Sequence, residues 1–104
     1  MPRVVACAVI RDDPPQVFVA EDIETLNWVL ALRLIARTPG HEVEAGARAR
    51  LRAALLDEQW GTAVELWMQV HPGEVDVYPS FAFHTTGDVD LAFQELQFTP
   101  LFQD

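Results

Sequence analysis

The sequence predicts a single α+β domain over residues 1–104, with a mostly antiparallel four-stranded sheet and two to three helices on one face. Three observations predict this class. A chain of 104 residues suits one domain. Half of its residues are hydrophobic, which is enough for a packed core. Strand-like patterns stand on both sides of a long helical stretch, so the expected order is β-β-α-α-β-(α)-β in two layers.

Two strands open this order. Residues 4–11 form a valine-rich apolar run, which is typical of a strand buried on both faces. Residues 12–15 (Asp-Asp-Pro-Pro) are typical of a turn, and residues 16–20 resume a strand pattern. We therefore expect a hairpin over the first 20 residues.

A helix is predicted over residues 23–37, with Asp22 as its N-cap and residues 38–40 (Thr-Pro-Gly) ending it. At 100° per residue its apolar side chains spread around almost the whole circumference. Such a helix is buried on most sides. We expect it to lie between the sheet and another helix, or to face a second copy of the chain.

A second helix is predicted over about 43–58, with Glu44 and Arg48 in the favourable i,i+4 order. Gly61 is expected to interrupt or end it. The apolar stripe that starts at Trp60 predicts that helix resumes or continues to about residue 70.

The C-terminal part begins with an alternating strand pattern over residues 75–85. One face is expected to carry Val75, Val77, Phe81 and Phe83, and the other Asp76, Tyr78, Ser80 and His84. Pro79 inside the pattern predicts an edge strand or a bulge. Residues 88–96 fit a helix capped by Asp88, whereas residues 95–99 also fit a strand. We favour one short helical turn followed by a strand that ends at Pro100.

Charge is divided unequally along the chain. The net charge of −9 arises entirely after residue 56, because all seven arginines lie between Arg3 and Arg52 and there is no lysine. This asymmetry favours a basic protein surface as partner and opposes binding to nucleic acid.

Two sets of residues are candidates for a site. Exposed aromatic residues among acids are typical of a protein interface with a basic partner. The partner-binding candidates are Trp60, Glu74, Asp76, Tyr78, Asp88 and Asp90. The alternative is a ligand pocket between sheet and helices in which His84 and Tyr78 are the polar groups.

No catalytic, cofactor or metal motif is recognised, so we expect no cofactor and no metal. The pair Asp88 and Asp90 lacks the further oxygens of a calcium loop. Cys7 is expected to be a buried, inert thiol. His41 and His71 are expected on the surface or at a helix end.

The segments 48–63 (RARLRAALLDEQWGTA) and 95–102 (ELQFTPLF) resemble small acidic proteins of high-GC actinobacteria, a group with no activity that could be carried over. The resemblance implies a cytoplasmic bacterial origin. A single cysteine fits the same setting, and the apolar stretch 28–36 is too short to span a membrane.

The leading hypothesis is a non-catalytic protein-binding module, such as a regulator, inhibitor or immunity-type protein, that uses its acidic C-terminal half. One alternative is a small dimeric enzyme or ligand-binding domain. Another is a structural subunit of a larger assembly, with the helix over residues 23–37 as the contact between copies.

Overall fold

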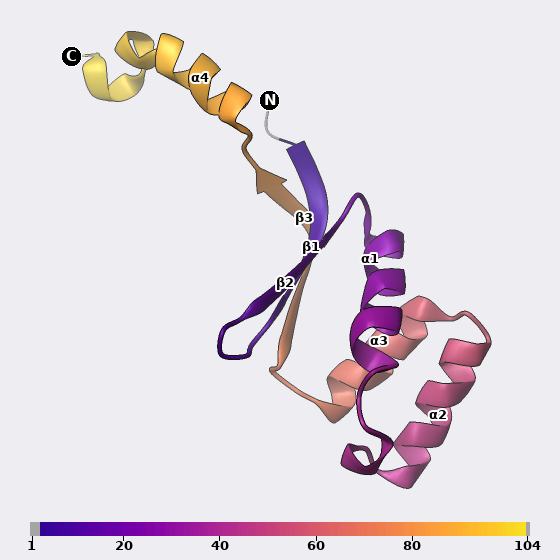
Figure 1. The fold of residues 1–104 in the computed structure, drawn as a ribbon. Coiled ribbons are helices and arrows are strands. Elements are labelled where there is room, and N and C mark those ends of the chain that lie inside the picture. Colours follow the sequence, from indigo (N-terminus) through magenta and orange to yellow (C-terminus); the bar gives the residue numbers. More distant parts are fainter. Residues whose placement is uncertain (1–2, 104) are drawn as a thin grey trace.

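The sheet of this α+β protein has three antiparallel strands in the order β2-β1-β3, in a computed structural model that describes residues 3–103. Three helices, α1–α3, gather on one side of the sheet, whereas α4 stands away from it (Figure 1). The elements are β1 (Arg3–Ile10), β2 (Gln16–Ala20), α1 (Ile23–Leu30), the π-helical η1 (Ala31–Ile35), the 3-10 turn η2 (Gly40–Glu42), α2 (Ala45–Leu56), α3 (Trp60–Val70), β3 (Val75–Phe83), α4 (Thr86–Gln94) and the 3-10 turns η3 (Leu96–Phe98) and η4 (Pro100–Phe102).

The predicted fourth strand over residues 95–99 is wrong, because this segment forms η3 and the start of a second turn. The expected single helical turn is a nine-residue helix, α4. A fourth strand would have to return to an edge of the sheet. Instead, only two residues separate β3 from the next helix, and the chain continues away from the sheet (Figure 1).

The hairpin predicted over the first 20 residues is confirmed. Central strand β1 pairs with β2 on one side and with β3 on the other. Directly opposite residues of antiparallel strands share a face. Ala8 lies opposite both Phe18 and Val77, so these three side chains face the helices, where the core cluster includes Ala8.

A bulge in β3 corrects the predicted faces of that strand. Val5 pairs with Phe81, but Cys7 pairs with Tyr78, so Pro79 and Ser80 together lie opposite the single residue between Val5 and Cys7. The extra residue reverses the alternation of β3. Phe81 and Phe83 therefore share the face of Tyr78, away from the helices, and not the face of Val75 and Val77. Pro79 marks both a bulge and an edge strand, as its position predicted.

The first helix begins as predicted at Asp22, whose side chain accepts a hydrogen bond of 2.7 Å from the backbone N–H of Thr25. Its last five residues form a π-helical turn, in which the N–H of Ala36 donates to the carbonyl of Ala31. Leu26, Leu30 and Ile35 are all buried, at spacings of four and then five residues. The wider turn keeps Ile35 on the buried side.

Helices α2 and α3 are separate, and Gly61 does not divide them. The break lies at Glu58, which adopts a left-handed backbone conformation with φ of 57°. The N–H of Gln59 donates to the carbonyl of Ala54 and that of Glu58 to the carbonyl of Leu55. This is a Schellman ending, in which glycine normally occupies the position of Glu58.

Packing is confined to the body of the fold. The core joins one face of the sheet to α1, α2 and α3, with Leu26, Leu30 and Ala63 almost fully buried in it. None of the residues 86–103 is buried. The molecule measures 63 × 26 × 20 Å, and its radius of gyration of 18.8 Å exceeds the roughly 13 Å typical of a 104-residue domain.

Candidate functional site

The face of the sheet away from the helices is apolar, and no element within residues 3–103 forms a second layer on it. We call it the open sheet face. It forms a shallow hollow of about 420 Å³, lined by Val5, Cys7, Val9, Val17, Val19, Phe81 and Phe83. Val19 is 58% exposed although it lies opposite the buried Cys7 in the middle of the sheet. On the open sheet face Cys7 of β1 is buried and Val5 and Val9 are half-buried, so the predicted burial of β1 on both faces is met in part.

Both strands beside β1 contribute to the open sheet face because of their register. Val17 and Val19 of β2 lie opposite Val9 and Cys7. On the other side the bulge in β3 adds Phe81 opposite Val5. Asp76 also lies on this face, where the guanidinium of Arg11 donates to it at 3.0 Å. That ion pair neutralises one edge of an otherwise apolar surface.

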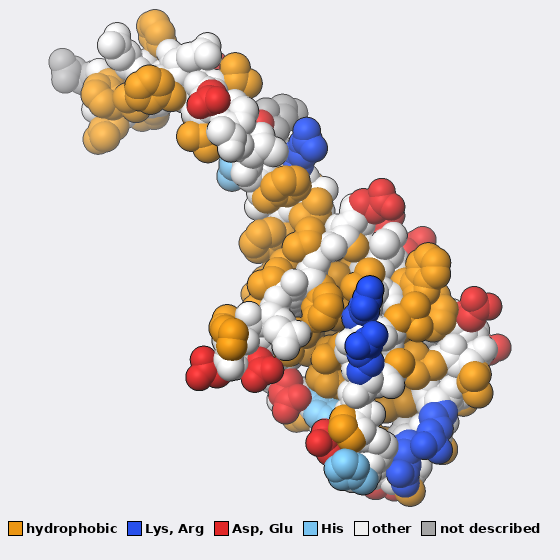
Figure 2. Space-filling model, in the orientation of Figure 1, with side chains coloured by type: hydrophobic (Ala, Val, Ile, Leu, Met, Phe, Trp, Pro, Cys, Tyr) orange, Lys and Arg blue, Asp and Glu red, His pale blue; other side chains and the backbone are white. Residues whose placement is uncertain are grey.

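A second apolar surface lies on residues 86–103, which we call the arm. The arm projects from the end of β3, and hydrophobic side chains gather on it (Figures 1 and 2). Phe93 is 73% exposed and Phe98 79% exposed. Val89, Ala92 and Phe93 follow the i, i+3, i+4 spacing of one helix face. Such a stripe normally packs against another surface, and among residues 3–103 none of its positions is buried.

A capping box fixes the start of the arm. The N–H of Thr85 donates to the carboxylate of Asp88 at 2.8 Å, and the N–H of Asp88 donates to the hydroxyl of Thr85 at 3.2 Å. These hydrogen bonds with Thr85, assisted by the nearby His84, lower the pKa of the Asp88 carboxyl. Thr85 is thus the N-cap, and Asp88, which the sequence predicted as the cap, is the third residue of the helix.

The six predicted partner-binding residues do not form one surface. Glu74 precedes β3, Asp76 and Tyr78 lie on the open sheet face, and Asp88 and Asp90 lie on the arm. Trp60 starts α3 and stacks on Trp28, with 6.3 Å between ring centroids. Acidic side chains accordingly occupy several separate places on the molecule (Figure 2).

The predicted ligand site is not assembled as expected. Tyr78 faces the open side of the sheet, whereas His84 follows the end of β3 on the way to the arm. Neither residue lines the hollow of the open sheet face. His71 caps the end of α3, as its position predicted, and stacks on Trp67 at 4.2 Å between ring centroids.

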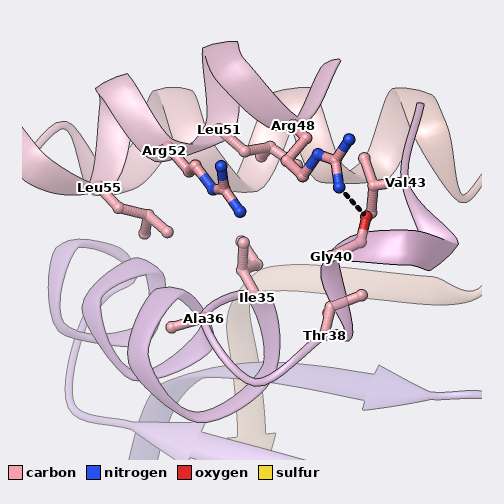
Figure 3. Close-up of a pocket in the computed structure, with 9 residues that line it drawn as sticks. All are labelled: Ile35, Ala36, Thr38, Gly40, Val43, Arg48, Leu51, Arg52 and Leu55. Carbon is pink, nitrogen blue, oxygen red and sulfur yellow. Dashed lines mark hydrogen bonds between the residues drawn. The ribbon is translucent and has the colours of Figure 1, made fainter. Parts of the chain in front are cut away.

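A separate cleft of about 170 Å³ lies between α2 and the segment that follows α1. Arg48 and Arg52 project into it from consecutive turns of α2, where Leu51 also lies, and Ile35 faces them from the segment after α1 (Figure 3). Arg48 donates to the carbonyl of Gly40 at 3.2 Å instead of pairing with Glu44. The Glu44 carboxylate caps α2 by accepting from the N–H groups of Gly46 and Ala47.

Other site chemistry is sparse in the part of the chain that the structure describes. Within residues 3–103, no group of three His, Cys, Asp or Glu side chains could hold a metal ion. Cys7 is free and buried. None of the helices in this range combines the length and apolarity needed to cross a membrane.

Comparisons with protein-family models, with curated proteins and with solved structures found no match. The resemblance of segments 48–63 and 95–102 to actinobacterial proteins therefore stays a prediction. The candidate site rests on geometry alone.

The residues that dominate this geometry were not among the sequence candidates. Val17 and Val19 fell within a predicted strand, and Phe93 and Phe98 were not singled out. One signal for the open sheet face was present in the sequence: β1 is apolar at almost every position, although the chain has too few helices to cover both faces of a sheet.

Proposed function

We propose that this protein is a non-catalytic protein-binding module that uses the open sheet face and the arm. One observation supports this most strongly: two extended apolar surfaces of a single chain are left uncovered. Contiguous apolar surface of this kind marks interaction sites in soluble proteins, because leaving it in water costs free energy.

The proposed role of charge changes with the geometry. An acidic half that steers the protein to a basic surface would need its carboxylates on one side, but they are spread over the ends of helices, the start of β3 and the arm. The arm itself carries Asp88, Asp90 and Glu95 and no positive residue within 86–103. The acids of the arm therefore supply the electrostatic attraction to a basic partner. Apolar contacts supply most of the affinity.

Affinity capture from a lysate of the source cell tests this proposal, with four forms of the full chain as bait. Val19→Asp places a charge on the open sheet face, and Phe93→Asp places one on the arm. Leu56→Asp is the matched control, since Leu56 is 87% exposed at the end of α2. We expect proteins retained by the wild type and by Leu56→Asp to be lost from the other two baits. An identical set of proteins on all four baits would contradict the proposal.

A second candidate function rests on the cleft of Arg48 and Arg52. Two guanidinium groups beside apolar side chains suit a small amphipathic carboxylate, since arginine binds carboxylates through paired hydrogen bonds. Thermal shift with medium-chain fatty acids at neutral pH tests this. We expect stabilisation that Arg52→Gln abolishes and that Arg50→Gln, on the same helix but outside the cleft lining, leaves intact. No shift with any chain length would remove this candidate.

A further inference from the structure

We infer that two copies of this chain pair by reciprocal exchange, with the arm of each copy lying across the open sheet face of the other. This inference rests on the proposed function and names its partner. In the part of the chain that the structure describes, the open sheet face has no covering element and the apolar side chains of the arm are exposed. In a two-fold symmetric pair, each arm covers the open sheet face of the other copy. Both faces and both arms are then covered without another molecule.

The exposed area of the chain supports a second copy. A folded monomer of 11.7 kDa typically exposes about 5,900 Å², whereas this chain exposes 7684 Å². The difference is about 1,800 Å² for each chain, or roughly 3,600 Å² for a pair, and permanent homodimers bury about 2,000 to 5,000 Å² in total. The large radius of gyration also supports a second copy, because the arm extends the molecule to 63 Å.

The connection between β3 and the arm favours exchange over closure within one chain. Only His84 and Thr85 separate the strand from the helix, and the capping box of Thr85 and Asp88 fixes how the helix starts. From this start the arm continues beyond the end of its own sheet (Figure 1). The open sheet face of a second copy can meet the arm without any change in this connection.

Charge favours contact between an arm and a face over contact between two arms. Within residues 86–103 the arm carries three carboxylates and no positive group, so two arms side by side would repel each other. The open sheet face has Arg3 at its end, directly opposite Phe83 in the register of β1 and β3. An acidic arm that crosses the apolar face thus meets a cation at its border.

Sedimentation velocity of the full chain at micromolar concentration, combined with a complementation experiment, tests the exchange. The wild type is expected at twice the chain mass of 11.7 kDa. Val19→Asp and Phe93→Asp are each expected to weaken dimerisation at least tenfold, whereas Leu56→Asp leaves it unchanged. Both test positions are more than half exposed in the single chain, so we expect the variants to keep its fold, which circular dichroism checks.

Mixing the two defective variants then distinguishes exchange from other dimers. The intact arm of Val19→Asp can lie on the intact face of Phe93→Asp, so the mixture is expected to form a heterodimer with one of the two contacts restored. Native mass spectrometry resolves this heterodimer from either homodimer.

Each other result overturns the exchange in a distinct way. A wild type that is monomeric at all concentrations excludes a second copy but leaves the surface for a different protein. A dimer broken by Val19→Asp but not by Phe93→Asp shows that two sheet faces pack together without the arms. A dimer that neither variant affects uses another surface, such as the exposed Trp28 and Leu32 of the first helix, and also counts against the proposed function.

Discussion

Tyr78 and Phe81 pack against each other on the open sheet face, with their ring centroids 5.8 Å apart and their planes tilted by 58°. In an unbroken strand, residues three positions apart point to opposite faces. The bulge at Pro79 and Ser80 places them on the same face. One extra residue therefore transfers Phe81 and Phe83 from the expected core to the candidate interaction surface.

The π-helical turn after α1 predicts a large cost for truncating Ile35. In an unbroken α-helix Ile35 would lie half a turn away from the buried Leu26, yet Ile35 is also buried. We expect Ile35→Ala to lower the free energy of unfolding by about 2–5 kcal/mol. Leu32→Ala is the control, because Leu32 is 47% exposed, and it should cost less than about 1 kcal/mol. Urea unfolding measures both, and equal costs would contradict the π-helical geometry.

The left-handed residue at the end of α2 predicts a stabilising substitution. Glu58 has a φ of 57° at a position where glycine is normal. A non-glycine residue in this conformation is strained by roughly 1–2 kcal/mol, part of which is offset by the greater freedom of glycine in the unfolded chain. We expect Glu58→Gly to raise the free energy of unfolding by about 1 kcal/mol.

Asp57→Gly is the matched control for Glu58→Gly. Asp57 is the preceding residue and has a φ of −88°, so glycine relieves no strain there. This variant should leave the free energy of unfolding unchanged or lower it slightly. Stabilisation by both variants would point to loss of negative charge as the cause, since each removes one carboxylate.

Sequence patterns located most elements because local chemistry decides them. The turn at residues 12–15, the cap at Asp22 and the proline in β3 each act over a few residues, and the structure confirms all three. The break at Glu58 and the π-helical turn were missed. Both depend on how helices pack. Neither glutamate at position 58 nor the residue types of the π-helical turn predict such a conformation.

The candidate site was harder to predict than the fold. Alternation in residues 75–85 suggested that Phe81 belonged to the core, because a bulge of one residue is invisible in the pattern itself. The aromatic residues of the tail are exposed, although apolar residues are normally buried. Their exposure is decided by where the chain travels after β3, which no local pattern specifies.

Three helix-capping carboxylates predict a fall in stability at acidic pH. Backbone hydrogen bonds from helix N-termini lower the pKa of Asp22, Glu44 and Asp88 below the ordinary values of 3.8 for Asp and 4.5 for Glu. A carboxyl whose pKa is lower in the folded state stabilises the fold above its unfolded pKa. This contribution is lost as the pH falls through the folded pKa. The free energy of unfolding should therefore decrease from about pH 4.5 downward.

Glu44→Gln isolates one of these contributions. Glutamine keeps a hydrogen-bond acceptor for Gly46 or Ala47 but does not titrate, so the decrease in stability below pH 4.5 should become shallower. Glu65→Gln, at an exposed position of α3, is the control and should keep the wild-type slope. Urea unfolding at a series of pH values between 3 and 7 compares the slopes; identical slopes for all three proteins would refute a capping role for Glu44.

A hydrogen bond between Trp67 and Thr38 predicts that the two residues contribute to stability as a pair. The indole N–H of Trp67 donates to the hydroxyl of Thr38 at 3.3 Å, and this hydroxyl donates to the carbonyl of Leu34 at 3.0 Å. Trp67 is buried, so Thr38→Val leaves its N–H without a partner and should cost about 1–3 kcal/mol. Thr62→Val, at an exposed position of α3, should cost much less.

The double variant Thr38→Val, Trp67→Phe completes this test. Phenylalanine has no N–H to leave unsatisfied, so the double variant should be more stable than the sum of the two single losses predicts, by about 1 kcal/mol. Urea unfolding of the four proteins gives this coupling. Strictly additive losses would mean that the hydrogen bond adds nothing and that packing alone holds the loop after the first helix against α3.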